Sequence, residues 1–251
     1  MTAQPERRSW IARKFSRNRR MEARLIVRYG AVHRYPLFAG IDPAYHRPVM
    51  MRLAYDPKHK FFFARIPKAG NSTVVSTLIR HIDPTASAAS MAADKQRLNR
   101  LPTKRQFDAA FKFTVVRDPT DRVISGYLDK VARDADGFGP DAFGAFLQEL
   151  RDGDYRKNGH FIPQTAMIPG GLGAMDHVGR IETLDADLEV ICTRLFGGFT
   201  ARTDRVAHRT GAATNRAALL TPENTDLISA LYRQDFEALG YPAPIPFDGA
   251  N

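Results

Sequence analysis

A short polar segment, residues 67–73, contains the residue types that bind phosphate. Besides Pro67 and Ala69, it holds a lysine, a glycine, an amide and two hydroxyls: Lys68, Gly70, Asn71, Ser72 and Thr73. The ammonium brings a full charge, the glycine lets a ligand approach the backbone closely, and the hydroxyls can donate to an oxyanion. We therefore interpret this segment as a candidate anion-binding loop.

The elements on either side of the loop favour that interpretation. An aromatic and aliphatic run predicts a strand over 61–66, and apolar residues at helical spacing predict a helix over 72–82. A helix N-terminus carries N–H groups without internal partners and the positive end of the helix dipole. A strand that leads through a polar loop into a helix is therefore suited to bind a phosphate group.

The order of residues in the loop excludes one common nucleotide site. The nucleoside-triphosphatase loop reads G-x-x-x-x-G-K-[ST], whereas Lys68 precedes Gly70 here and no glycine opens the loop. Taken alone, the segment is equally compatible with an ordinary turn whose helix is capped by Asn71 or Ser72. A second element is needed to decide.

Residues 111–131 supply that second element. A predicted strand over 111–116 ends at Arg117, and Asp118 and Pro119 are typical of the start of the helix that follows. Two strand–loop–helix units indicate parallel strands covered by helices, and ligands bind at the carboxyl ends of such strands. Lys68 and Arg117 both lie there. The sequence thus predicts an α/β fold, a three-layer sandwich with a central parallel sheet.

Other segments complete the expected sheet and its helices. The segment 85–105 offers little that could anchor a core and is expected to be a surface excursion with at most one short helix. The remaining predictions, in chain order, are a strand over 49–55 with a turn at 56–59, a helix over 140–150, a strand over 177–181, a helix over 184–195, and a helix from Thr221 to Gly240.

Composition places the chain among globular proteins and locates its charge. The 251 residues are 43% hydrophobic and 25% charged, with a formal net charge of +10. Residues 1–34 hold ten Lys/Arg and two acidic residues, so the remainder carries a net charge of only +2. A nearly neutral body argues against a nucleic-acid binder. We expect a basic arm over 1–34 and a single domain over 35–251.

The arm and the single cysteine bear on location. Apolar residues between the basic ones leave two interpretations of the arm open. It is either a solvated extension or an amphipathic helix over 7–34 that contacts an anionic membrane peripherally. Cys192 excludes an internal disulfide and is expected to be a buried structural thiol. These features fit the cytoplasm, with the inner face of the membrane as the site of any peripheral contact.

Several segments resemble one family, the sulfotransferases that use 3′-phosphoadenosine 5′-phosphosulfate, in their carbohydrate branch. Residues 66–73 are similar to the family's 5′-phosphosulfate loop, and residues 115–127 to its 3′-phosphate motif. Weaker similarities lie at 160–164, 179–182 and 231–236. The resemblance implies a P-loop-like nucleotide-binding core of the sulfotransferase type. It also implies that the activated sulfate is the donor and that a hydroxyl of a carbohydrate or glycoconjugate is the acceptor.

The resemblance also implies roles for individual residues. Pro67, Lys68, Ala69, Gly70, Asn71, Ser72 and Thr73 would hold the 5′-phosphosulfate, and Arg117 and Ser125 the 3′-phosphate. Lys68 would also neutralise charge on the leaving oxygen. Arg209, in the basic loop 208–211, is a further candidate for the 3′-phosphate, with an exposed charged turn as the alternative.

The acceptor hydroxyl needs a general base, and histidine has a suitable pKa. His160 is the candidate, with a structural hydrogen-bonding role as the alternative, and Glu182 is the reserve. No metal is expected, because the scattered histidines and single cysteine lack ligand spacing.

Two other functions stay open at this point. A nucleotide-dependent kinase of related fold would need Mg²⁺ and a carboxylate to hold it. A nucleotide- or membrane-binding module without catalysis would bind the same ligand without turnover.

Overall fold

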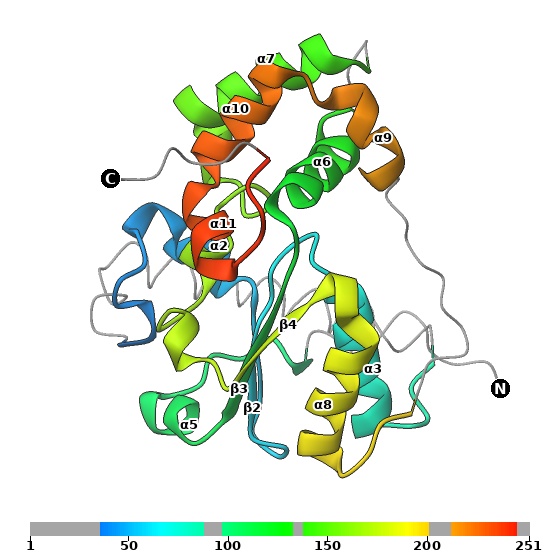
Figure 1. Cartoon of the computed structure of the whole chain (residues 1–251). Helices are drawn as coiled ribbons and strands as arrows, with labels where there is room; N and C mark the ends of the chain where they lie inside the picture. Colours follow the sequence, from blue (N-terminus) through cyan, green and yellow to red (C-terminus); the bar gives the residue numbers. More distant parts are fainter. Residues whose placement is uncertain (1–35, 88–96, 133–137, 201–211, 245–251) are drawn as a thin grey trace, which may run out of the picture.

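The computed structural model describes residues 36–87, 97–132, 138–200 and 212–244. Its centre is a four-stranded sheet in the order β1 (Leu53–Asp56), β2 (Phe61–Ala64), β3 (Phe111–Val116) and β4 (His177–Arg180) (Figure 1). β1 and β2 form an antiparallel hairpin, and β2, β3 and β4 run parallel. The predicted α/β fold is confirmed, with one antiparallel strand at the edge of the parallel sheet.

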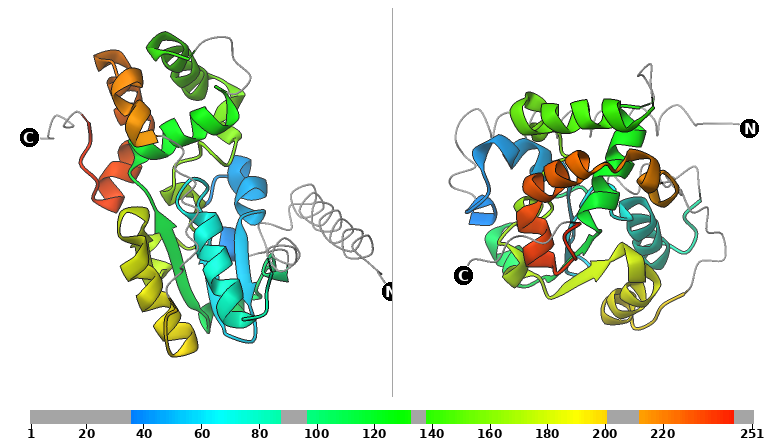
Figure 2. Two further views of the ribbon diagram at one scale, coloured as in Figure 1. Left: turned by 90° about the vertical axis from the view of Figure 1, so that its right-hand side faces the viewer. Right: turned by 45° about the horizontal axis from the view of Figure 1, so that its top comes forward.

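Two long helices cover one face of the sheet. α3 (Asn71–Ile82) and α8 (Leu184–Phe196) lie side by side there (Figures 1 and 2). Phe61 and Phe63 of β2 and Phe113 of β3 pack against these helices. The rings of Phe63 and Phe113 stack with their centroids 4.7 Å apart. Since the other face is covered as well, the strands read as continuous apolar runs rather than as alternating ones.

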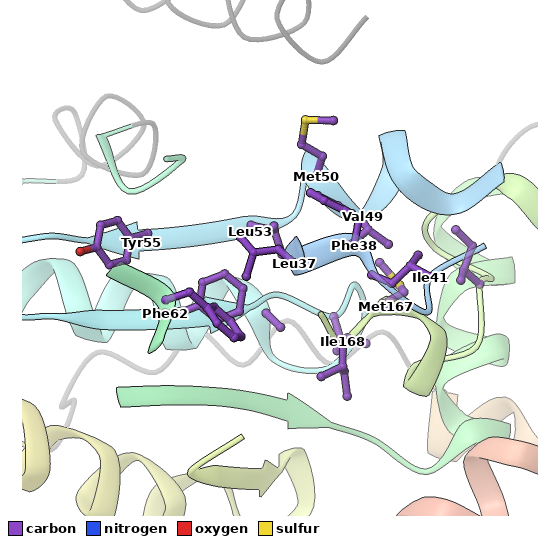
Figure 3. Packing of buried hydrophobic residues seen from close by; sticks show 14 of the residues in the cluster. Leu37, Phe38, Ile41, Val49, Met50, Leu53, Tyr55, Phe62, Met167 and Ile168 are labelled. Atoms are coloured by element: carbon purple, nitrogen blue, oxygen red, sulfur yellow. The ribbon is translucent and has the colours of Figure 1, made fainter. Parts of the chain in front are cut away.

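The opposite face packs against short elements rather than long helices. These are α2 (His46–Met50), α5 (Lys104–Asp108) and the irregular chain around Met167 and Ile168. Figure 3 shows Phe62 and Leu53 of the sheet pointing into this cluster. Short 3₁₀ turns complete this layer and the loops: Pro36–Phe38, Pro43–Tyr45, Asp154–Lys157, Thr165–Met167, Leu172–Ala174 and Ile181–Thr183.

A third group of helices lies beyond the carboxyl edge of the strands. It consists of α6 (Pro119–Lys130), α7 (Pro140–Asp152), α9 (Ala212–Leu219), α10 (Pro222–Leu231) and α11 (Arg233–Leu239). They share a core of their own, with Tyr127, Phe143 and Phe236 buried in it. Figure 1 shows this helical group above the sheet, so the carboxyl edge lies between two packed cores.

Three sequence predictions differ from the structure. The strand predicted over 49–55 begins only at Leu53, because Val49 and Met50 end helix α2; short apolar runs fit a buried helix and a strand equally well. The helix predicted from Thr221 to Gly240 is two helices that meet at Tyr232, whose φ of −119° leaves the helical region. Tyr232 donates its hydroxyl hydrogen to the carbonyl of Phe161 at 2.9 Å.

The third difference concerns the segment 85–105, expected to be a surface excursion without core anchors. Leu98 is buried, and helix α5 begins at Lys104 behind a capping box of Thr103 and Gln106. Phe107 of α5 packs edge-on against Phe62 at 4.9 Å. Leu98 within the segment and Phe107 just after it therefore anchor the segment to the core.

Candidate phosphate-binding site at the carboxyl edge of the sheet

The loop after β2 turns through two left-handed residues. Lys68 has φ of 69° and Gly70 has φ of 71°, and α3 begins at the next residue, Asn71. A Cβ on Gly70 would lie 3.2 Å from Leu184 Cδ2, so both the conformation and the space favour glycine. A lysine with positive φ is uncommon, and such strain concentrates at functional positions.

The N-terminus of α3 has no side-chain cap. The N-cap residue is Gly70, not Asn71 or Ser72 as an ordinary capped turn would have it. The N–H groups of Asn71, Ser72 and Thr73 belong to the first turn, which leaves them without helical partners. Within the described residues, Asn71 Oδ1 is also buried without a partner. The three N–H groups fit an anionic ligand, which would accept hydrogen bonds from them. Asn71 Oδ1 is itself an acceptor and would need a donor.

Arg117 connects the second motif directly to this loop. Its Nη1 donates to the carbonyl oxygen of Lys68 at 3.2 Å. The side chain of Gln164 holds the Arg117 backbone on both sides, with Arg117 N to Oε1 at 3.0 Å and Nε2 to Arg117 O at 2.7 Å. The structure thus brings Lys68 and Arg117 together, as the parallel strands predict. Ser125 is buried two turns into α6.

Gln164 is itself fixed by a buried carboxylate. Asp235 on α11 is 0% exposed and accepts from Gln164 N at 2.7 Å, Thr165 N at 2.9 Å and Thr165 Oγ1 at 2.8 Å. A carboxylate that accepts three hydrogen bonds is well satisfied without water. The C-terminal helix therefore braces Arg117 through Gln164.

Sequence reasoning missed three cations near the loop: Arg52, Arg122 and Lys130. Arg122 is fully buried and donates from Nε to the carbonyl of Pro67 at 3.1 Å. Its position inside the segment 115–127, five residues after Arg117, was the signal available in the sequence. Together with Lys68 and Arg117 these residues concentrate positive charge at the edge of the sheet.

Asp129 faces the two lysines of this group. Lys68 Nζ lies 2.8 Å from Asp129 Oδ2, and Lys130 Nζ lies 2.9 Å from the same oxygen. The two ammonium groups, Lys68 first, hold the pKa of Asp129 well below its usual range. Burial lowers the pKa of Lys68, and its hydrogen bond to Asp129 opposes that shift. The sequence analysis did not single out Asp129.

His160, the candidate base, lies near the same cations. Burial, followed by the charges of Arg52, Lys130, Lys68 and Arg122, lowers the pKa of His160 to about 3. Its Nε2 lies 3.3 Å from Arg52 Nη2 and must be the acceptor, because a guanidinium only donates. The ring proton is then on Nδ1, which is buried and has no partner among the described residues. His160 is a neutral hydrogen-bonding group in this arrangement.

Glu182, the reserve base, has both carboxylate oxygens engaged. Oε1 accepts from Asp118 N at 2.9 Å, and Oε2 accepts from the Tyr241 hydroxyl at 2.9 Å. Burial, with Glu182 as the next cause, raises the pKa of Tyr241. Arg180 stacks on the Tyr241 ring at 4.3 Å. Glu182 therefore braces the start of α6.

Other predicted and observed features lie away from this edge. Arg209 and residues 1–34 fall outside the described residues. A cavity of about 400 Å³, lined by residues such as Tyr55, Lys58 and Arg97, lies at the opposite end of β2. In the described parts of the chain, no three His, Cys, Asp or Glu side chains gather as a metal ion would require. None of the helices described there is long and apolar enough to cross a membrane.

The fold is that of an α/β protein, with a candidate anion site at the ends of two parallel strands. A family model described as the sulfotransferase family matches residues 51–242, and the chain belongs to that family. It is also similar to carbohydrate sulfotransferase 10 of Gallus gallus, with 33% identity over 94 residues. That similarity covers 33% of this chain and 26% of the relative, so the chain matches about a quarter of the relative's length. No solved structure shows significant similarity to the chain.

Proposed function

We propose that this protein transfers the sulfuryl group of 3′-phosphoadenosine 5′-phosphosulfate to a hydroxyl of a carbohydrate or glycoconjugate. The observation that carries the proposal is the 3.2 Å contact between Arg117 Nη1 and the carbonyl of Lys68. This contact supports the proposal because the two candidate anion-binding elements then lie side by side, as a ligand with two separate phosphate groups requires. Membership of the sulfotransferase family and the name of the avian relative support the same donor and acceptor class.

The groups at the site fit the donor's anionic parts. The uncapped start of α3 offers backbone N–H groups at Asn71, Ser72 and Thr73 for the 5′-phosphosulfate, and Lys68 adds a charge. Arg117 offers a planar set of donors for the 3′-phosphate, and Ser125 is the hydroxyl assigned beside it. When bound, the donor supplies the activated sulfuryl group.

Catalysis at such a site depends on position and charge more than on covalent chemistry of the protein. Lys68 would neutralise the charge that grows on the oxygen leaving the sulfur. We propose His160 as the candidate base on the acceptor side of the site, where Nε2 of its neutral ring would accept from the hydroxyl in place of Arg52. This assignment rests on its closeness to Lys68 and Lys130, whose charges act on it.

We also propose a cytoplasmic location, with residues 1–34 as the candidate for peripheral contact with the inner face of the membrane. Cys192 supports a reducing compartment, because it is a free thiol buried within α8.

Calorimetric titration tests the donor class without knowledge of the acceptor. We expect adenosine 3′,5′-bisphosphate to bind more tightly than ATP, with or without Mg²⁺. ATP binding that is tighter and depends on Mg²⁺ would instead support the kinase alternative. Transfer of radiolabelled sulfate from the donor to a panel of glycans then tests catalysis. Bisphosphate binding with no transfer to any glycan would favour the non-catalytic module.

A further inference from the structure

The ammonium of Lys68 is bound to a carboxylate from a distant part of the chain. Lys68 Nζ donates to Asp129 Oδ2 at 2.8 Å, across 61 residues of sequence. The side chains are 13% and 25% exposed, so water screens the pair only partly. Across the described residues, no other acidic side chain pairs with Lys68. The same ammonium is the group assigned above to the leaving oxygen.

The position of Asp129 is unfavourable for its own helix. Asp129 lies in the last turn of α6, which ends at Lys130. The C-terminal end of a helix carries partial negative charge, so a cation is favoured there and a carboxylate is not. Helix stability therefore does not account for an acid at this position. Its contacts with the Lys68 and Lys130 ammonium groups do.

Asp129 is also held differently from Asp118 and Glu182, two other carboxylates at this edge. Asp118 caps α6 by accepting from Asp121 N, and Glu182 accepts from Asp118 N and the Tyr241 hydroxyl. Those bonds fix both side chains to the fold. Asp129 is bound by the flexible ends of two lysines, which can leave without any change in the backbone.

An anion at the start of α3 must compete with this carboxylate for Lys68. While the pair is closed, the charge of Lys68 is largely balanced by Asp129, and the approaching phosphate also meets the negative charge of Asp129.

We propose that Asp129 restrains Lys68, and that nucleotide binding at the loop draws the Lys68 ammonium away from Asp129. Asp129 is then a positioning residue that acts on the ligand through Lys68. It lowers affinity selectively for ligands that carry a 5′-phosphate. This inference rests on the proposed function, because it takes the loop to be the 5′-phosphate site.

A pair of ligands separates this effect from general electrostatics. Adenosine 3′,5′-bisphosphate has the 5′-phosphate that would meet Lys68, and adenosine 3′-monophosphate lacks it. In Asp129→Asn, we expect the bisphosphate to bind roughly fivefold to tenfold more tightly than in wild type. Affinity for the 3′-monophosphate should stay within about twofold.

A double-mutant cycle ties the effect to Lys68. In a Lys68→Met background, Asp129→Asn should no longer favour the bisphosphate, because the restrained ammonium is gone. Asp108→Asn is the control variant: it removes the same charge from the exposed Lys104–Asp108 pair on α5. It should leave both affinities unchanged.

The outcomes are distinguishable. Equal tightening for both ligands, or a gain that persists without Lys68, would reduce Asp129 to a general electrostatic influence and overturn the inference. Unchanged or weaker bisphosphate binding in Asp129→Asn would overturn it as well. A wild-type protein that binds neither ligand would overturn the proposed function itself and this inference with it.

A measurement on wild type guards against a variant that fails to fold. The charged groups that face Asp129 are Lys68 from the loop and Lys130 from its own helix. The carboxyl carbon resonance of Asp129 should titrate at higher pH when bisphosphate is bound, because Lys68 has left it. An unchanged titration would show that the pair stays closed in the complex, contrary to the inference.

Discussion

The guanidinium of Arg117 holds the loop at Lys68 and keeps further donors for the proposed ligand. A single positive charge could not combine these two functions. One nitrogen of the Arg117 guanidinium holds the carbonyl of Lys68, and the Arg117 backbone is clamped by the amide of Gln164. The planar group has five donors, so others stay available for a ligand while Nη1 holds the loop. A lysine at this position would have neither the fork nor the fixed plane.

Replacing Arg117 should weaken nucleotide binding. We expect Arg117→Ala to lower the affinity for adenosine 3′,5′-bisphosphate by about 10- to 100-fold, the size expected for lost hydrogen bonds to a charged group. Calorimetric titration measures this change. Arg151→Ala, which removes an exposed arginine paired with its neighbour Asp152, is the control and should bind as wild type. Equal affinities in Arg117→Ala and wild type would remove Arg117 from the site.

At the scale of residues, the sequence predicted the side chains that directly follow strands. It missed the side chains that reach the loop from helices distant in the sequence. Lys68 and Arg117 follow directly from strand ends in a parallel sheet. Asp129 and Arg122 reach the loop from α6 across 61 and 55 residues, through side-chain contacts that no local pattern encodes. Similarly, the lowered pKa of His160 depends on burial and on four cations, which only the folded chain brings about.

The start of α3 depends on a single backbone conformation at Gly70. An alanine there would have to adopt φ of 71°, at a cost of about 1–2 kcal/mol, and its Cβ would press on Leu184. We expect Gly70→Ala to lower the melting temperature and also weaken bisphosphate binding, because the first N–H groups of α3 would move.

Gly197 offers a matched control for this prediction. It ends α8 with φ of 79°, and a Cβ there would meet nothing within 4 Å. Gly197→Ala should lower the melting temperature by a similar strain but leave bisphosphate affinity as in wild type. A Gly70→Ala variant that binds normally would show that the ligand does not use the N-terminus of α3.

Helix α11 contributes to the site without touching it. We expect Asp235→Asn to lower the free energy of unfolding by about 1–3 kcal/mol, because charge-assisted bonds to the 164–165 backbone are weakened. Bisphosphate affinity should fall as well, since Gln164 would no longer hold Arg117 firmly. Urea unfolding and calorimetry measure the two effects. Asp226→Asn, an exposed change on α10, should alter neither; if Asp235→Asn loses stability but keeps full affinity, α11 does not brace the site.

At the scale of elements, the predictions failed where the same apolar residues were compatible with more than one secondary structure. Val49 and Met50 could extend a strand or close a helix, and the packing of α2 against the sheet decided for the helix. The break between α10 and α11 at Tyr232 also involves a contact distant in sequence, because the Tyr232 hydroxyl donates to the carbonyl of Phe161. The long helices α3, α6 and α8 were predictable because their apolar stripes match a sheet face or a neighbouring helix.

The whole molecule should lose stability in mild acid because of His160. An unfolded histidine titrates near pH 6.5, whereas burial and nearby cations lower the folded pKa to about 3. Below pH 6.5 the unfolded chain therefore binds a proton that the folded chain does not, and the free energy of unfolding falls. The slope from this one group approaches about 1.4 kcal/mol per pH unit between these values.

Denaturant unfolding from pH 7 to pH 4 measures this slope in wild type and in His160→Asn. We expect the variant to have a shallower slope, because asparagine does not titrate. The same slope in both proteins would mean that His160 is charged, or solvated, in the folded state.

The layered architecture was the most predictable property of the chain. Two strand–loop–helix units, read from residues 61–82 and 111–131, correctly indicated parallel strands with helices across them. The helical group beyond the carboxyl edge was not anticipated as a separate core, because each of its helices has an ordinary amphipathic pattern.

The bond from Asp235 to Gln164 also bears on the order in which the chain is made. Both candidate phosphate motifs precede residue 130. The carboxylate that fixes Gln164 belongs to Asp235, which is synthesised more than 100 residues after Arg117. A chain that stops before α11 would contain both candidate phosphate motifs, residues 66–73 and 115–127. It would still lack Asp235, which fixes Gln164 against Arg117. Nucleotide binding should therefore be acquired only after α11 has been made.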